Sequence, residues 1–199
     1  IKSPIIEGSS GYWGKFVDPF HPEFSQSLEN SLKAQQGKSA DDPFCIGYFV
    51  DNEISWGDAG SLAKAAMLSP KTQPVKIAMI GWLQIRYEDS IEKLNQAWES
   101  DYPNWDYLLE NSINVPEKAK EDCDLYYSVI AEKYFEEIAK AVKKWAPNKL
   151  YLGCRFAWTN ELAEKAAGKY CDIVSYNFYK KSVADFQPPK GIDKPCIIG

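Results

Sequence analysis

The sequence is poor in histidine, in clustered positive charge and in long apolar runs. Its single histidine, His21, removes most histidine-based metal sites and histidine-activated nucleophiles. Asp and Glu outnumber Lys and Arg by 28 to 23, and the net charge of −5 argues against a nucleic-acid partner. No apolar run approaches the roughly 20 residues that cross a membrane. We therefore expect no nucleic acid and no membrane among the partners, and nothing in the sequence requires a metal or an organic cofactor.

The five cysteines are odd in number and lack close C-x-x-C spacing. They lie mostly in apolar segments, which is typical of buried free thiols. A zinc site or a disulfide framework is not expected from the cysteines at 45, 123, 154, 171 and 196.

The chain of 199 residues is long enough to bury a real core in one domain, at most two. It begins at Ile1 without Met or a signal peptide, and it stops in what reads as a strand at 197–199. These ends indicate a chain that is processed, trimmed or a fragment. The sequence does not indicate an oligomeric state.

Aromatic residues are abundant, with seven Trp and twelve Tyr. Aromatic faces pack against the apolar faces of sugar rings, while polar tips bind hydroxyls. A Trp-rich core is the better explanation of any single Trp, and only the aromatic content as a whole favours a carbohydrate ligand.

The most informative segment is an apolar run at 46–50 that is followed directly by Asp51, Asn52 and Glu53. The run predicts a β-strand that is buried on both faces. In parallel α/β folds the carboxyl ends of the strands hold the chemistry. An Asn-Glu pair there supplies an amide for a hydroxyl and a carboxyl group for a proton. A strand that meets a solvated turn is the alternative.

Strands and helices alternate in the rest of the pattern. Further strands are expected at 150–156, 172–179 and 195–199. Helices are expected at 62–68, 91–98, 117–145 and 161–167. Ser61 would cap the first of these helices, and the last would end at Gly168. The segment 76–87 is ambiguous between strand and helix, and 98–109 reads as an excursion from the main fold. The pattern predicts an α/β fold with a parallel sheet.

Three of the expected strands end in polar or aromatic groups. The first ends in Asn52 and Glu53, the second carries Arg155 and then Trp158, and the third carries Asn177 and Tyr179 with the nearby Tyr176. Because the carboxyl ends of parallel strands meet at one edge, these groups predict a sugar-binding cleft.

Several motifs resemble one enzyme family. GYFVDNEISWG at 47–57 is similar to the end of strand four in the β-agarases of glycoside hydrolase family 50. A related sequence, with Asp-Asn-Glu at the same strand end, occurs in the family 42 β-galactosidases. LYLGCRFA resembles strand five, DIVSYNFY strand six, KPCIIG the start of strand seven, and VDPFHPEF the loop after strand three. The resemblance runs from about residue 17 to 199. It implies part of a (β/α)8 TIM barrel, approximately strands three or four to seven, with outer helices.

The resemblance also implies roles for particular residues. Glu53 would be the general acid/base of a retaining hydrolase, and Asn52 would bind the 2-hydroxyl of the sugar at the cleaved bond. Less diagnostic substrate-binding positions are His21, Trp56, Arg155, Trp158, Asn177 and Tyr179. The substrate would be a galactose-containing polysaccharide or oligosaccharide of the agarose type, cleaved at β-1,4 linkages. A secreted or periplasmic location is implied by the family alone.

The chain departs from the family in one respect. A retaining mechanism needs a second carboxylate about 5–5.5 Å from the first, and in the family it follows the equivalent of Ile-Ile-Gly, so it is expected directly after Gly199. Within the chain, Glu161 reads as the first turn of a helix capped by Asn160, and Asp51 as a brace or a rim residue. A family 42-like β-galactosidase and a non-catalytic carbohydrate-binding remnant of a barrel stay as alternatives.

Overall fold

Four short strands form two parallel pairs in the computed structural model, which describes residues 3–11 and 14–199. β1 (Gly47–Tyr48) pairs with β2 (Leu150–Tyr151), and β3 (Val174–Tyr176) pairs with β4 (Cys196–Ile198). A parallel bridge between Phe156 and Tyr176 joins the two pairs. The predicted parallel sheet is therefore present, with its segments in sequence order and with their carboxyl ends on one side.

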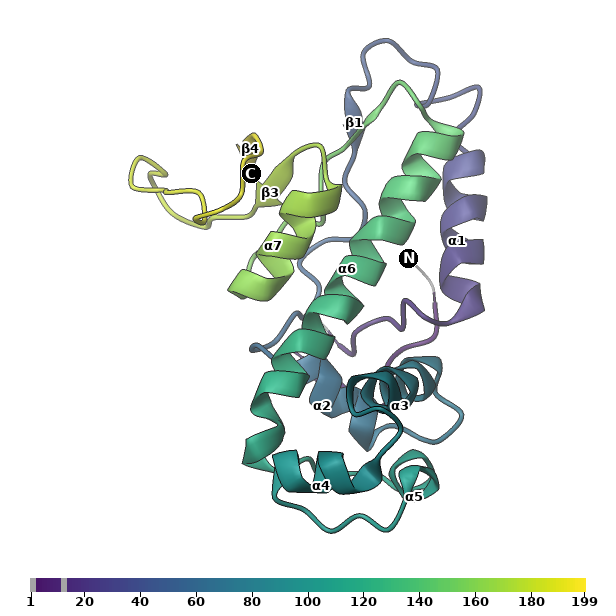
Figure 1. Cartoon of the computed structure of the whole chain (residues 1–199). Coiled ribbons are helices and arrows are strands. Elements are labelled where there is room, and N and C mark those ends of the chain that lie inside the picture. The colour runs from purple at the N-terminus through teal and green to yellow at the C-terminus, as the bar shows by residue number, and fades with distance from the viewer. Residues whose placement is uncertain (1–2, 12–13) are drawn as a thin grey trace.

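The helices of the described residues lie before β1, between β1 and β2, and between β2 and β3 (Figure 1). They are α1 (Pro22–Lys33), α2 (Ser61–Leu68), α3 (Pro74–Arg86), α4 (Ile91–Trp98), α5 (Trp105–Glu110), the 3-10 turn η1 (Glu117–Ala119), α6 (Lys120–Trp145) and α7 (Glu161–Tyr170). The ambiguous segment 76–87 is helical, and the excursion at 98–109 contains α5.

The long helix α6 organises the core. It contacts α1, α2 and α7 along its length, and α2 to α5 gather around its amino-terminal half (Figure 1). Its buried side chains recur at helical spacing, as the apolar stripe predicts, and include Tyr127, Tyr134, Phe135 and Ile138. The helix thus presents aromatic groups to the backs of the strands.

Three expectations about these elements are wrong. The strand at β1 is not buried on both faces, because Ile46 is 62% and Phe49 41% exposed on a segment that pairs with β2 alone among the described residues. Ser61 is the first residue of α2, and Gly60 with a φ of 77° precedes it as the cap. α7 continues through Gly168, whose missing side chain leaves room for Ile192.

The cysteines are free thiols, as predicted. Cys123, Cys154 and Cys171 are buried, and Cys45 and Cys196 are partly buried. In residues 3–11 and 14–199, no helix is long and apolar enough to cross a membrane.

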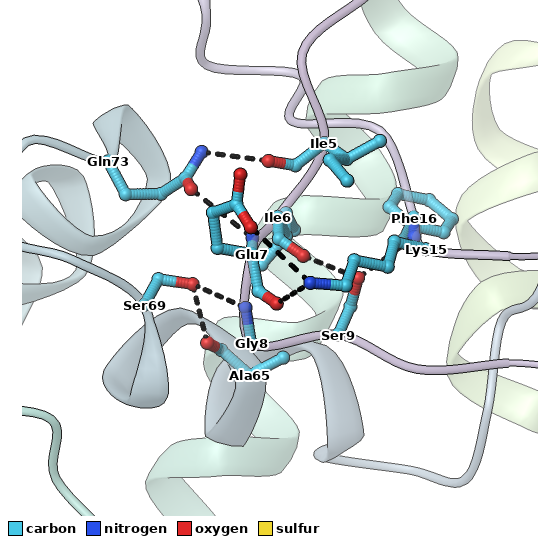
Figure 2. A network of polar contacts seen from close by, with 10 residues as sticks. All are labelled: Ile5, Ile6, Glu7, Gly8, Ser9, Lys15, Phe16, Ala65, Ser69 and Gln73. Carbon is cyan, nitrogen blue, oxygen red and sulfur yellow. Dashed lines mark hydrogen bonds and ion pairs between the residues drawn. The ribbon is translucent and has the colours of Figure 1, made fainter.

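A polar network fixes the amino-terminal segment against α2 and α3 (Figure 2). The backbone N–H of Glu7 donates to Gln73 Oε1 over 3.2 Å, and that of Gly8 donates to Ser69 Oγ over 3.0 Å. Ser9 Oγ links Ile6 to Phe16 across the loop. These contacts join the amino-terminal segment to the end of α2 and the start of α3.

Gly8 is a position where a side chain is expected to destabilise the fold. A Cβ at Gly8 would lie 2.3 Å from the carbonyl oxygen of Ala65. This oxygen belongs to the backbone of α2, so relief of the clash would require the helix backbone or the amino-terminal segment to move. Gly8→Ala should lower the free energy of unfolding by about 1–3 kcal/mol. Gly81→Ala is the control, because a Cβ there meets nothing within 4 Å on α3, and it should raise stability by about 0.5–1 kcal/mol. Urea unfolding of both variants measures the two effects, and equal effects would contradict the steric argument.

Candidate active site at the strand ends

Glu53 is the centre of a hydrogen-bonded cluster at the carboxyl ends of the strands. Its Oε1 accepts a hydrogen bond of 2.6 Å from Asn177 Nδ2 and another from the hydroxyl of Tyr179. Glu53 is 7% exposed, although Tyr179 is 81% exposed. The carboxylate is thus sheltered, and one of its partners stands in solvent.

Arg155 extends the cluster to a third strand end. Its Nε donates to Asn177 Oδ1 over 2.9 Å, and its backbone N–H donates to Ser175 Oγ over 2.9 Å. The amide of Asn177 is therefore fixed in one orientation, with its oxygen toward the guanidinium and its nitrogen toward Glu53. A hollow of about 210 Å³ lies beside these groups and is also lined by Phe49 and Gly199.

The backbone at these strand ends is unusual. Asp51, Glu53 and Arg155 have φ values of 61°, 53° and 53°, in the left-handed region that non-glycine residues rarely occupy. The N–H of Glu53 donates to the carbonyls of Cys154 and Arg155, each over 3.3 Å. Such residues cost energy and cluster at functional sites.

Asp51 braces the strand end from the other side. Its Oδ2 accepts a hydrogen bond of 2.8 Å from the hydroxyl of Tyr134, which is fully buried on α6. Asn52, the next residue, is exposed. The strand end thus directs Asp51 to the helix layer and Glu53 to the cluster, as the bracing interpretation of Asp51 expects.

The pKa of the Glu53 carboxyl is lowered. The hydrogen bond from Tyr179 is the main cause, followed by the bond from Asn177, and the positive charge of Arg155 adds to them, while partial burial opposes them. The mechanism implied by the resemblance requires a raised pKa, which the described residues do not provide. The physical reason is that the described residues surround Glu53 with donors and a positive charge.

The structure gathers some of the candidate site residues and separates others. Glu53, Arg155, Asn177 and Tyr179 form one connected cluster. Trp158 is 64% exposed and lines a different cavity.

Two of the candidates have structural contacts. Trp56 is 1% exposed, and its ring stacks on Phe135 with ring centroids 5.2 Å apart. His21 caps α1, and its Nδ1 accepts a hydrogen bond of 3.2 Å from the backbone N–H of Glu23. Neither of these contacts involves Glu53.

Two contributors were missed in the sequence. Ser175 positions the backbone of Arg155, and Tyr134 holds Asp51. The period-2 alternation of the strand at 174–177 puts Ser175 and Asn177 on the same face, so this signal was available for Ser175. Nothing local indicates Tyr134, which lies 83 residues from Asp51 in the sequence.

Two curated relatives align with almost the whole chain. β-Agarase B of Vibrio sp. (strain JT0107) is 35% identical over 211 residues, and β-agarase A of the same strain is 32% identical over 222 residues. Each alignment covers 98% of this chain. The chain is homologous to β-agarases. It spans 22% of the length of each of these relatives, and no protein-family model matches it.

Solved structures place this agarase homologue in the same fold. The crystal structure of an agarase has a TM-score of 0.86 and 32% identity, over 100% of this chain and 30% of the other. An exo-β-agarase has a TM-score of 0.86 and 30% identity, over 100% and 29%. A β-galactosidase from Marinomonas ef1, at a TM-score of 0.58 and 14% identity over 92% and 29%, shares the fold alone. The resemblance that the motifs indicated is confirmed.

Removing the Tyr179 hydroxyl should raise the pKa of Glu53. In the folded state this pKa is below its ordinary value, so the cluster stabilises the fold at higher pH, and this contribution is lost as the pH falls through the lowered pKa. In Tyr179→Phe the main cause of the lowering is absent, and the loss should begin at higher pH. NMR titration of the Glu53 side-chain carboxyl measures the shift, with Tyr107→Phe as the control. An unchanged Glu53 titration in Tyr179→Phe would refute the assignment.

Proposed function

We propose that the full-length protein is a retaining glycoside hydrolase that cleaves β-1,4-galactosidic linkages in agarose or neoagaro-oligosaccharides. The observation that carries the proposal is the sheltered Glu53 carboxyl, held by Asn177 and Tyr179 at the strand ends of a chain homologous to β-agarases. In this proposal residues 1–199 are part of a (β/α)8 barrel. β1, β2, β3 and β4 correspond to strands four to seven.

Glu53 acts as the general acid/base. In the first step it protonates the departing glycosidic oxygen, and in the second it accepts a proton from the attacking water. Exposed Asn52 precedes it and is available for the 2-hydroxyl of the sugar. Arg155 and Asn177 keep the carboxyl in place through the two hydrogen bonds of the Asn177 amide.

The nucleophile of this mechanism is a second carboxylate, which we place on a Glu directly after Gly199 in the full-length protein. Support comes from the position of Gly199, where a Cβ would lie 3.4 Å from a guanidinium nitrogen of Arg155 and 3.8 Å from Asn177 Oδ1. A chain that continues from this point passes beside the cluster. The negative charge of the second carboxylate would raise the pKa of Glu53 and keep the acid protonated.

The test compares two Asn-Glu dipeptides in the full-length protein. Glu53→Gln should abolish the release of reducing sugar from agarose. Glu161→Gln is the matched control, because Glu161 also follows an Asn but lies on α7 and pairs with Lys165 at 2.8 Å. Undiminished release in Glu53→Gln would refute the assignment. Hydrolysis of an aryl β-galactoside without action on agarose would instead favour a β-galactosidase, and sugar binding without turnover a non-catalytic barrel.

We place this enzyme outside the cytoplasm, secreted or periplasmic, because an enzyme that acts on a polymer must meet it there. Immunoblotting of cell fractions with an antibody to the chain tests this location.

A further inference from the structure

A second cavity lies beside β3 and the segment that follows it, and none of Glu53, Arg155, Asn177 and Tyr179 lines it. Asn177 and Tyr179 bond to Glu53, whereas Phe178 lines this cavity, and Tyr176 lines both this cavity and the hollow beside Arg155. Its volume is about 460 Å³, against about 210 Å³ for the hollow beside Arg155. Small-molecule sites commonly have volumes of roughly 300–1,000 Å³, so the second cavity is large enough for a ligand of its own.

Aromatic rings form the walls. Phe178 and Phe186 pack with centroids 5.2 Å apart, and Tyr176 lies 5.2 Å from Phe186. Trp158 also lines the cavity and is 64% exposed, so its ring stands at the rim. An exposed aromatic ring beside an aromatic wall suits a flat, partly apolar ligand such as a sugar ring.

Polar groups in the cavity match hydroxyls better than a charged ligand. Glu164 lines it, and burial together with the charge of Glu161 raises the pKa of the Glu164 carboxyl. The lining residues include two acids, Glu164 and Asp185, and one cation, Lys180, which does not favour an anion. The hydroxyl of Tyr176 is buried and has no hydrogen-bond partner among the described residues. Buried polar atoms normally have one, so a ligand or water that bonds in this region is expected.

We propose that this cavity is a second carbohydrate-binding site, which takes a neutral pyranose unit between Trp158 and Glu164. The site is separate from the Glu53 cluster and holds sugar without cleaving it. That its sugar is a unit of an agarose chain rests on the proposed function; that it binds a neutral sugar rests on the cavity alone.

The proposal is tested by calorimetry. Full-length protein with the substitution Glu53→Gln is titrated with a neoagaro-oligosaccharide of four units. Two binding sites are expected. Adding Trp158→Ala should remove the second site or weaken it by about tenfold, a loss typical of one aromatic contact together with its burial. Glu164→Leu should weaken the same site. Tyr107→Ala is the control, because Tyr107 is an exposed aromatic residue on α5 that does not line this cavity.

Several outcomes would overturn the second site. One is a single binding site in Glu53→Gln protein. Another is two sites that neither Trp158→Ala nor Glu164→Leu affects. A third is a single site that Trp158→Ala weakens, which would place Trp158 in the catalytic cleft. The two proposals can fail separately. If Glu53→Gln protein does not hydrolyse agarose but has one binding site, only the second site is refuted. If Glu53→Gln protein still hydrolyses agarose, only the acid/base assignment is refuted.

Discussion

Glu53→Gln is expected to lower kcat/KM on agarose oligosaccharides by about two to four orders of magnitude, the range that general acid–base catalysis contributes. The leaving group in these substrates is a sugar hydroxyl, which departs poorly as an alkoxide and needs a proton. The substituted amide would keep the size of the side chain and a group that can bond to Tyr179, but it has no proton to give. The loss should therefore come from chemistry and not from folding, and a cooperative unfolding transition that lies above the assay temperature checks this point.

The size of the loss should depend on the leaving group. An aryl galactoside with an acidic phenol needs little protonation, so its kcat/KM, which reports the first bond-breaking step, should fall far less in Glu53→Gln. The alkaline limb of the kcat/KM profile for oligosaccharides should also disappear, because it reports the proton on the acid. Equal losses on both substrates, with the alkaline limb retained, would assign Glu53 another role. Glu161→Gln should match the unmodified protein in every measurement.

Much of the Glu53 cluster was predictable because its residues are identified by short sequence patterns. Apolar runs that end in polar residues place Glu53, Arg155 and Asn177 at strand ends, and parallel pairing brings those ends together. The helices at 91–98 and 117–145 follow from periodicity and capping. Each of these predictions depends only on residues close in sequence and on one general rule about sheets.

Other features of the structure depend on contacts between distant segments. Trp56 follows Glu53 by three residues, and its ring stacks on Phe135 of α6, which is distant in the sequence. Gly168 is predicted as the end of a helix, yet α7 continues through it. The side chain of Ile192 packs against Gly168 so closely that a Cβ there would lie 2.9 Å from Ile192 Cγ2. No local pattern specifies either contact.

The largest loss of stability is expected from Asp122→Ala. The Asp122 carboxylate is buried on α6 and pairs with Arg86 Nε at 2.6 Å. It also accepts hydrogen bonds from Tyr87 over 2.6 Å and from the indole of Trp98 over 2.7 Å. Burial and the Asp122 charge raise the pKa of Tyr87 to about 12, so its hydroxyl remains a donor. One carboxylate thus joins α3 and α4 to α6.

Removal of this carboxylate leaves three donors without their common acceptor, and two of them, on Tyr87 and Trp98, are sheltered from water. Breaking a buried pair costs about 3–5 kcal/mol. Because the Arg86 side chain is 35% exposed and recovers hydration, we expect about 3 kcal/mol for Asp122→Ala. Glu121→Ala is the control, since Glu121 pairs with the same Arg86 at 3.0 Å but its side chain is 80% exposed, and it should cost at most about 1 kcal/mol. Urea unfolding of the two variants compares one arginine's buried and exposed partners, and similar losses would show that burial does not determine the strength of this junction.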